Sequence, residues 1–541
     1  MKKVILLLTF CIFAGLNPAV GNPKPAAQKP NIIIYFADDI SAREFPVYGS
    51  SVWSSPKAKN TSDPKYRAQT PVLERLAEEG VTVKTAWGAT ICSPSRAMMM
   101  TGRYAHLHKW WHNGDFGRWI NPDTNRKEVI PLYITCPIMM GDLARQAGYG
   151  TYWAGKTQIV GDYERYGFDE GCFTPGRWED LDNPYADFKL VFKKGPDGRD
   201  LMKNGRKRIW NLDDGKEYPG YKQHSWNFFP HVRVMYHPDS DKKLDWWPVT
   251  PEQQKRFGLH TYGADVELEH IFNFMDRQHA QNKPFLIYHT SHLGHDAFDF
   301  LHPESGNKWP GTPIAKWDGS KYHRVKTRIT GDRGVYDTHG TVSEPGIHSH
   351  INYIDYQIWQ YLEKLSELGI ENNTVLIITA DNGTSQYGKG YEDRQKGTHV
   401  PFIVYAPGFN FTKQGMQDIL VNLADVYPTV ADLVGTEIPE DYEVNGKSLW
   451  PYLTTDAEDH REWIYSYKKD KQFIRGHHVM RDGNGVWWDV SSDPADLISF
   501  TEITDWEMVP KEYREERDRL IEAMKPFDLY DTAHDYPGYT N

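Results

Sequence analysis

An uninterrupted apolar segment near the start of the chain ends in two adjacent carboxylates, and this feature constrains the fold most. Residues 31–36 read Asn-Ile-Ile-Ile-Tyr-Phe, and Ala37 leads directly into Asp38 and Asp39. A strand without alternating polar residues is typical of a parallel sheet that helices cover on both faces. The carboxylates are therefore expected at the carboxyl end of a buried strand, where α/β proteins bind their ligands.

Further apolar segments alternate with helical patterns along the chain. The expected strands are 149–153, 285–288, 375–379 and 402–405, and the expected helices are 70–80, 263–279 and 351–368. This alternation predicts an α/β fold in which a large mixed, mostly parallel sheet is sandwiched by helices. After about residue 455, short alternating segments such as 472–480 and 485–490 predict a smaller C-terminal antiparallel-sheet subdomain.

The chain is predicted to have three parts. Residues 1–21 combine two lysines, a short apolar run and small residues near Gly21, which is the pattern of a secretory signal peptide. Residues 22–455 form the α/β domain, with an insertion at about 174–255, and residues 456–541 form the C-terminal subdomain. We therefore expect an exported protein, periplasmic or extracellular after removal of the signal, with no integral membrane segment.

Composition restricts the partners. The 541 residues carry a formal net charge of −11 without a dense run of Lys or Arg, which argues against nucleic acid as a partner. The chain also holds 19 Trp, whose rings either grip sugar rings or pack as framework under the insertion. The tryptophans in question are Trp178, Trp210, Trp226, Trp246 and Trp247, together with the pair Trp110 and Trp111.

A second expected strand ends in the same type of side chain as the first. Asp381 and Asn382 follow the strand at 375–379, as Asp38 and Asp39 follow the strand at 31–36. Three carboxylates and one amide, without Cys or His at ligand spacing nearby, suit a hard cation such as Ca²⁺ or Mg²⁺. Either pair alone is a weak signal, because Asp and Asn commonly occur in turns.

Three cysteines remain once the signal peptide is removed. An exported protein normally pairs its thiols, so an odd number indicates one cysteine with a separate role. Cys136 and Cys172 either pair or stay buried as small hydrophobic residues. Cys92 is the candidate for the separate role.

Residues 92–103 read Cys-Ser-Pro-Ser-Arg-Ala-Met-Met-Met-Thr-Gly-Arg. This segment resembles the signature of the formylglycine-dependent (type I) sulfatase family, in the alkaline-phosphatase-like superfamily. The resemblance implies a sulfuric ester hydrolase in which a maturation enzyme oxidises Cys92 to formylglycine. The hydrated aldehyde supplies one hydroxyl as nucleophile, and its partner hydroxyl later expels sulfate, which divides a difficult displacement into two easier steps.

The resemblance extends over nearly the whole chain after the signal peptide. Matching segments lie at 70–81, 148–156, 284–295, 351–355, 373–383, 401–408, 425–429 and 445–449. The resemblance implies that Ca²⁺ is bound by the aspartates and asparagine above and by the oxygen of modified Cys92, with Mg²⁺ as the alternative ion.

The resemblance also implies roles for basic residues. Arg96 would orient the hydrated aldehyde, and Lys156 and Lys389 would hold the charge of the sulfate or of the leaving oxygen. His295 would donate a proton to the departing alcohol, with His292 as the alternative at the substrate.

Two segments depart from the family pattern. Gln158 stands where the family has a histidine after Gly-Lys-Trp, and a glutamine forms hydrogen bonds but takes up no proton. Residues 393–399 replace the usual Glu-Gly-Gly-x-Arg, so that Lys396 or His399 could share in binding the anion.

The expected substrate is a sulfated carbohydrate, since aromatic faces in the insertion suit sugar rings. A phosphonate monoester or phosphodiester hydrolase of the same superfamily is one alternative. A non-catalytic glycan-binding relative is another, and Gln158 is the residue that motivates it.

Overall fold

The computed structural model describes residues 29–174, 190–199, 201–203, 206–211, 215, 217–218, 232–247, 262–295, 297, 312–325 and 343–536. The expected signal peptide and much of the expected insertion lie outside the described residues. No helix among the described residues is long and apolar enough to span a bilayer.

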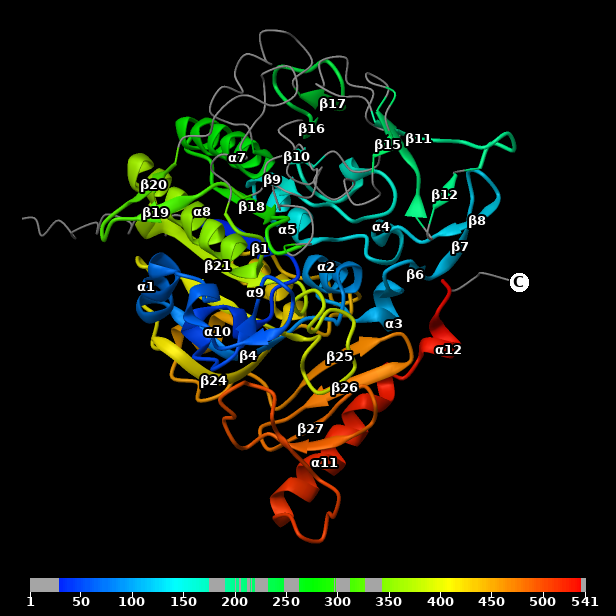
Figure 1. The fold of residues 1–541 in the computed structure, drawn as a ribbon, viewed down its shortest axis with the longest axis vertical. Helices are drawn as coiled ribbons and strands as arrows, with labels where there is room; N and C mark the ends of the chain where they lie inside the picture. Colours follow the sequence, from blue (N-terminus) through cyan, green and yellow to red (C-terminus); the bar gives the residue numbers. More distant parts are fainter. Residues whose placement is uncertain are drawn as a thin grey trace, which may run out of the picture.

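A mixed sheet forms the centre of the molecule (Figure 1). Its central strand β1 (Asn31–Ala37) is buried along its whole length and lies parallel to β18 (Phe285–Thr290) and to β21 (Thr374–Ala380). Beyond β18 follow β9 (Gly150–Gly155) and β10 (Glu170–Phe173), which are also parallel. The continuous apolar runs therefore form the parallel centre of the sheet, as predicted.

Antiparallel pairs complete the sheet on both sides. One side adds β23 (Phe402–Tyr405), β4 (Val81–Trp87) and β22 (His399–Val400), with β24 (Gly415–Asn422) parallel to β4. The other side adds β16 (Val232–Met235) and β17 (Leu244–Trp247). The parallel order is thus confined to the middle of the sheet and to the β4–β24 pair.

Helices cover both faces of the sheet. The helices α1 (Pro71–Glu79), α7 (Gly263–Ala280) and α8 (Ile347–Leu368) pack together as one layer. The other layer contains α2 (Cys92–Thr101), α5 (Met140–Gln146) and α9 (Val426–Val434). The α/β sandwich expected from the sequence is confirmed.

A separate antiparallel sheet lies at the C-terminal end, at the bottom of Figure 1. Its strands are β25 (Ile464–Lys468), β26 (Lys471–Arg475), β27 (Val479–Arg481), β28 (Trp487–Asp489) and β29 (Thr501–Glu502). Helix α11 (Lys511–Met524) packs on β26 and β27. The side chain of Trp87 from β4 joins the core of this sheet with Ile464 and Phe473, so the two sheets share apolar packing. The domain boundary at residue 455 stays a prediction.

Smaller elements connect these layers. The short strands are β2 (Trp53–Ser54), β3 (Asn60–Thr61), β5 (Trp110–His112), β6 (Asp115–Phe116), β7 (Arg118–Asn121), β8 (Arg126–Val129), β11 (Leu190–Phe192), β12 (Met202–Lys203), β13 (Arg206–Lys207), β14 (Ile209–Asn211), β15 (Glu217–Tyr218), β19 (Ala315–Trp317) and β20 (Tyr322–Arg324). The short helices are η1 (Ala42–Glu44), η2 (Pro46–Tyr48), η3 (Pro64–Tyr66), α3 (Ala105–His108), α4 (Leu132–Thr135), η4 (Tyr163–Arg165), η10 (Glu371–Asn373), η11 (Leu423–Asp425), α10 (Trp450–Thr454), η12 (Lys525–Phe527) and α12 (Tyr530–Ala533).

The tryptophans expected to grip sugar rings serve as framework where their side chains are described. Trp110 and Trp111 are fully buried, and Trp246 and Trp247 are buried as well. Trp178, Trp226 and the side chain of Trp210 lie outside the described residues. Burial of the rings favours the packing alternative, because a buried indole has no free face for a ligand.

Cys136 and Cys172 are both buried and both free, and so is Cys92. Among the described cysteines the alternative of small buried residues therefore applies to Cys136 and Cys172.

Candidate functional site

Four acidic or sulfur side chains meet at the carboxyl ends of β1 and β21. Asp38, Asp39, Cys92 and Asp381 are buried, and one ligand atom from each lies within 4.8 Å of the others. The register of the two strands pairs Ala37 with Ala380, so the carboxylates that follow them emerge side by side. The strand order thus brings together residues that lie far apart in the sequence.

Cys92 joins this group from α2, of which it is the first residue and which follows β4. β4 and β21 both lie antiparallel to β23 between them, so β4 runs in the same direction as β21 and ends at the same edge of the sheet. The Cys92 Sγ lies 3.8 Å from Asp38 Oδ1 and 3.6 Å from Asp39 Oδ1. Burial raises the pKa of the Cys92 thiol far above its usual range. An unmodified thiol at this position stays protonated at neutral pH and is a weak nucleophile.

The turn after β1 is held in an unusual backbone conformation. Asp39 has a φ of +53°, and its N–H donates to Asp381 Oδ1 at 2.9 Å. Asn382 Nδ2 donates to Asp39 Oδ1 at 2.8 Å, and the Ser385 hydroxyl donates to Asp39 Oδ2 at 2.7 Å. Left-handed conformations at residues other than glycine are strained and cluster at functional sites. These hydrogen bonds fix the Asp39 carboxylate toward the cluster.

Three basic side chains surround the carboxylates. Burial alone would raise the pKa of Asp38, but the neighbouring Lys156, His295 and Arg96 charges hold it well below its usual range. Burial and the adjacent Asp38 charge instead raise the pKa of Asp381. The shortest ion pairs are Arg96 Nη2–Asp381 Oδ2 at 2.9 Å, Lys156 Nζ–Asp38 Oδ2 at 2.5 Å and Lys389 Nζ–Asp39 Oδ2 at 2.6 Å, and Arg96 Nη2 also lies 3.6 Å from Asp38 Oδ1.

Two histidines follow β18 and approach the cluster from one loop. His292 Nδ1 lies 3.7 Å from Asp38 Oδ2, and its Nε2 lies 2.9 Å from the Thr174 hydroxyl. His295 Nε2 lies 3.8 Å from Asp39 Oδ2. Burial and the nearby Lys156 charge hold the pKa of His292 well below its usual range. The imidazole of His295 is the more exposed of the two, at 16% against 8%.

The donor set fits a hard divalent cation. The Oδ1 atom of Asn382, the residue after Asp381, is buried and has no hydrogen-bond partner among the described residues. An orphaned buried carbonyl oxygen beside three carboxylates is the arrangement that an oxygen-seeking ion satisfies. Ca²⁺ fits this set, since it takes several carboxylate and amide oxygens in a flexible geometry.

A cavity of about 810 Å³ borders the cluster. Lys156 and His292 line it together with Gln158, Asn113 and Arg233. Gln158 has a φ of +48°, and its side-chain carbonyl oxygen is buried without a hydrogen-bond partner. The cavity offers both hydrogen-bonding and apolar groups next to the Lys156 ammonium, and its volume lies in the range of small-molecule sites.

The structure does not bring every candidate residue to the cluster. Lys396 Nζ forms an ion pair with Asp393 Oδ2 at 2.6 Å instead of with the cluster carboxylates. His399 is buried, and its Nε2 lies 2.9 Å from the Lys84 carbonyl oxygen. Lys389, by contrast, reaches Asp39, so of these three residues it is the one placed at the site.

Several residues of the site were not expected from the sequence. Ser385 binds Asp39, Thr174 binds His292, and Asn113 accepts a hydrogen bond from the Ser93 N–H through its Oδ1 at 2.9 Å. Ser385 follows Asn382 by three residues, and this closeness in the sequence is the signal that could have found it. Thr174 and Asn113 lie in segments with no motif or period that marks them.

Comparison with known proteins adds a family assignment. The model of the Sulfatase family matches residues 30–436. The N-acetylglucosamine-6-O-sulfatase of Bacteroides thetaiotaomicron is 23% identical over 90% of this chain and 82% of that protein. The mouse steryl-sulfatase is 24% identical over 88% of this chain and 72% of that protein.

Solved structures share the fold. The PsFucS1 sulfatase from Pseudoalteromonas sp. superposes with a TM-score of 0.56 at 18% identity, covering 95% of this chain and 92% of that one. A protein solved with its substrate D-glucosamine-2-N,6-O-disulfate gives a TM-score of 0.53 at 19% identity, covering 93% and 99%. Since the family model spans most of the chain, including Cys92 and the carboxylate cluster, this protein belongs to the sulfatase family, whose members are sulfuric ester hydrolases.

Proposed function

We propose that this chain is an exported sulfatase that hydrolyses a sulfate ester of a carbohydrate, with Cys92 converted to formylglycine and Ca²⁺ bound beside it. One observation carries the proposal. Cys92, at the head of the sulfatase signature, lies within 4 Å of two of the three buried carboxylates that are suited to a cation. The maturation enzyme that oxidises Cys92 is the implied partner, and the amino-terminal segment 1–21 supports export.

Residues Asp38, Asp39, Asp381 and Asn382 would hold the ion, together with the oxygen of modified Cys92. Bound there, Ca²⁺ would supply Lewis acidity and a template for the sulfate oxygens. The aldehyde hydrate would supply the attacking hydroxyl, and water and ester would be converted to alcohol and inorganic sulfate.

The basic residues would manage the charge of the substrate. Lys156 and Lys389 present ammonium groups at the carboxylates that would bind the ion, so a sulfate group bound there lies within their reach. Arg96 holds Asp381 and stands one turn into the helix that begins with Cys92, which suits a residue that orients the nucleophile. Fixed positive charges in a buried site stabilise the negative charge that develops on the leaving oxygen.

The departing alcohol requires a proton, because an alkoxide leaves reluctantly. His295 is the proposed donor, since its imidazole lies at the cluster and is partly exposed. His292 is bound to Thr174 and lines the cavity, which suits a residue that positions the substrate. Gln158 presents an unpartnered carbonyl oxygen there and is the proposed acceptor for a hydroxyl or amide N–H of the sugar.

The substrate class has support from relatives and from the cavity. Relatives over most of the chain include an N-acetylglucosamine-6-O-sulfatase and an N-acetylgalactosamine-6-O-sulfatase, both from Bacteroides thetaiotaomicron. The cavity beside Lys156 has the size and the mixed polar and apolar lining that a sugar ring requires.

A substrate panel tests the proposal. The matured protein is incubated with sulfated glycans and sugar sulfates and, in parallel, with matched phosphate diesters and phosphonate monoesters, and released anion is measured. We expect sulfate release from sugar sulfates and much slower turnover of the phosphorus esters. Preference for the phosphorus esters, or glycan binding without sulfate release by protein with modified Cys92, would contradict the proposal.

A further inference from the structure

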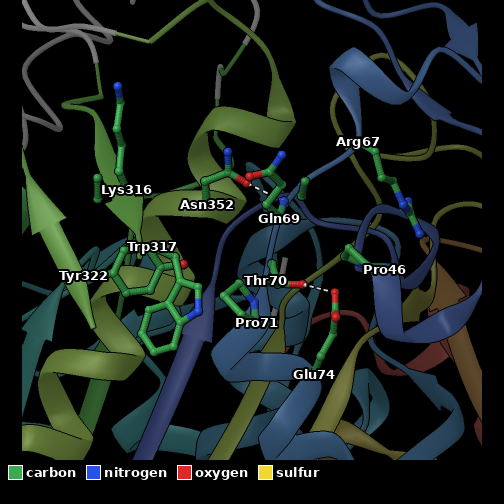
Figure 2. Close-up of a pocket in the computed structure, with 12 residues that line it drawn as sticks. Pro46, Arg67, Gln69, Thr70, Pro71, Glu74, Lys316, Trp317, Tyr322 and Asn352 are labelled. Atoms are coloured by element: carbon green, nitrogen blue, oxygen red, sulfur yellow. Dashed lines mark hydrogen bonds between the residues drawn. The ribbon is translucent and has the colours of Figure 1, made fainter. Parts of the chain in front are cut away.

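A second cavity, of about 740 Å³, lies at the N-terminus of α1 (Figure 2). None of its lining residues lines the cavity beside Cys92. In Figure 1, α1 and the β19–β20 hairpin lie at the left of the molecule, whereas α2, which carries Cys92, lies near its centre. This cavity is therefore separate from the site described above.

Aromatic and amide groups form the middle of this cavity. Figure 2 shows the indole of Trp317 beside Pro71 and Thr70, with Asn352 and Gln69 close together next to them. The Trp317 ring is partly exposed and packs on the buried Tyr322 at 5.1 Å between centroids. Unlike the buried tryptophans of the framework, Trp317 is accessible to a ligand. The electron-rich face of an indole attracts the positively polarised C–H groups of a sugar ring.

The amide of Asn352 is held in place by the backbone. Its Oδ1 accepts a hydrogen bond from the Gln69 N–H at 2.7 Å, which leaves the Nδ2 group as a donor. Glu74 accepts a hydrogen bond from the Thr70 hydroxyl at 3.1 Å and keeps acceptor capacity for ligand hydroxyls. The lining therefore offers a fixed donor and a fixed acceptor near an aromatic ring, which is a combination that suits a carbohydrate.

Two cations lie at opposite ends of the view in Figure 2. Arg67 donates to the carbonyl oxygens of Arg43 and Phe45 at 2.8 and 3.3 Å, and its guanidinium lies 4.7 Å from the centroid of the Trp53 ring. These contacts fix the side chain, and no carboxylate among the described residues forms an ion pair with it, although the charges of Glu44 and Glu74 act on it from nearby. The side chain of the exposed Lys316 has no ion pair or hydrogen bond within the described part of the chain.

We propose that this cavity is an accessory binding site for a sulfated segment of a polysaccharide. The aromatic ring and the Asn352 and Glu74 side chains contact the sugar, and Arg67 and Lys316 contact its sulfate groups. The choice of a sulfated polymer rests on the proposed function of the catalytic site, whereas the cavity and its charges do not.

The chain that links the two sites limits their separation. Pro46, which lines the accessory cavity, follows Asp39 by seven residues, and seven extended residues span at most roughly 25 Å. A polymer bound at one site therefore keeps its neighbouring sugars at a high local concentration near the other. A short substrate, which reaches only the catalytic site, gains nothing from this arrangement.

Binding to a catalytically inactive protein tests the site directly. Full-length Cys92→Ala protein is titrated with heparin, chondroitin sulfate, carrageenan and fucoidan, with unsulfated dextran as a control. We expect Trp317→Ala and Lys316→Glu in this background to weaken the tightest polymer at least about fivefold, since each removes roughly 1 kcal/mol or more of contact. Lys511→Glu on α11, at the bottom of Figure 1, makes the same change of charge away from this cavity and should leave affinity unchanged.

Kinetics separate this inference from the catalytic proposal. In otherwise wild-type enzyme, Lys316→Glu and Trp317→Ala should raise KM for the polymer and leave kcat/KM unchanged for the shortest sulfated sugar cut from it. Lys316 is exposed, so its replacement tests the site even if Trp317→Ala folds poorly. Unchanged polymer binding in both variants would overturn the accessory site. An equal fall in kcat/KM for the polymer and for the short sugar would also overturn it. If wild type releases no sulfate from any substrate, the catalytic proposal fails while the titration still decides the accessory site.

Discussion

At the scale of single residues, the site balances three buried carboxylates against three basic side chains. Asp39 pairs with Lys389 and Asp381 with Arg96, whereas Asp38 pairs with both Lys156 and Arg96. Asn382 adds an oxygen that has no hydrogen-bond partner among the described residues. Such a set would suit an anionic substrate beside a cation, because the lysines would offset the repulsion between the carboxylates and a sulfate. The overall acidity of the chain, with a net charge of −11, makes this local positive charge necessary.

Replacement of His295 by Ala tests the proton donor. We expect kcat to fall roughly 10²–10⁴-fold on a sugar sulfate, because the poor alkoxide leaving group then departs without a proton. The loss should be much smaller for 4-nitrophenyl sulfate, whose phenolate leaves without one. His292→Ala is the comparison, since that residue is expected to affect KM more than kcat. If His295→Ala lowered kcat equally for the sugar sulfate and for 4-nitrophenyl sulfate, the donor role would be ruled out.

Replacement of Gln158 by Ala tests the sugar contact in the cavity. We expect KM for a sugar sulfate to rise about five- to tenfold, which corresponds to one lost hydrogen bond of about 1 kcal/mol. Gln386, a second glutamine with a positive φ but an exposed side chain, gives the matched control Gln386→Ala. Steady-state kinetics of both variants on sugar and aryl sulfates make the comparison. No change in KM with either substrate would remove Gln158 from the binding site.

At the scale of elements, continuous apolar runs predicted the parallel centre of the sheet well. The runs at 31–36, 285–288 and 375–379 became the parallel strands β1, β18 and β21. The run at 402–405 became β23 with the same bounds, but β23 pairs antiparallel with β21. The edge strands escaped prediction because they are short or half exposed: β22 has two residues, and β24 alternates between exposed and half-buried positions over its first half. The direction of strand pairing was not predicted either, because an apolar run is compatible with both a parallel and an antiparallel neighbour.

The candidate site shows the same division. Motifs predicted Cys92 and the carboxylates because their chemistry demands fixed residue types. Lys396 was placed at the anion by its segment alone, and the structure shows that it pairs with Asp393 three residues earlier. Arg233, which lines the cavity, comes from β16, a strand within the expected insertion that the sequence did not reveal.

The start of α1 depends on a carboxylate from α8. Asp355 accepts hydrogen bonds from the N–H groups of Val72 and Leu73 at 3.2 and 2.6 Å and from the Tyr322 hydroxyl at 2.5 Å. Replacement by Ala leaves these donors unsatisfied, and we expect a loss of about 1–3 kcal/mol in the free energy of unfolding. Denaturant unfolding measures this loss, and an unchanged free energy would contradict the role of Asp355.

The same carboxyl group makes stability depend on pH. Burial raises the pKa of Asp355 to about 7, although its hydrogen bonds act against that shift. Between the ordinary carboxyl pKa and 7, the folded protein holds a proton that the unfolded chain has released. The contribution of Asp355 to the free energy of unfolding therefore falls as the pH rises through this window. Unfolding at pH 5 and pH 8 should show a smaller fall for Asp355→Asn than for wild type, and identical falls would contradict the shift.

At the scale of the whole molecule, the cluster joins strands and helices from both halves of the catalytic part of the chain. Its carboxylates follow β1 and β21, and α2 adds Cys92. An ion held there links segments more than 340 residues apart in the sequence. Binding to the folded state alone stabilises that state by mass action.

Removal of calcium is therefore expected to affect both stability and activity. A chelator should lower Tm and abolish sulfate release, and added Ca²⁺ should restore both. At a Ca²⁺ concentration a hundredfold above Kd, the free energy of unfolding should rise by about 2.7 kcal/mol. Asp381→Asn is the control, since its Tm should respond far less to the ion. Thermal unfolding and sulfate release in the same buffers measure the effect. Full activity and an unchanged Tm in excess chelator would contradict the metal site.

The central claim is that Cys92 acts only after its conversion to formylglycine. The most direct measurement is mass spectrometry of the peptide that contains residues 92–103, on protein whose rate of sulfate release from a sugar sulfate has been determined. We expect the mass of an aldehyde in place of the thiol, an activity proportional to the modified fraction, and none in Cys92→Ala. Fully active protein in which Cys92 remains an unmodified thiol would contradict the account.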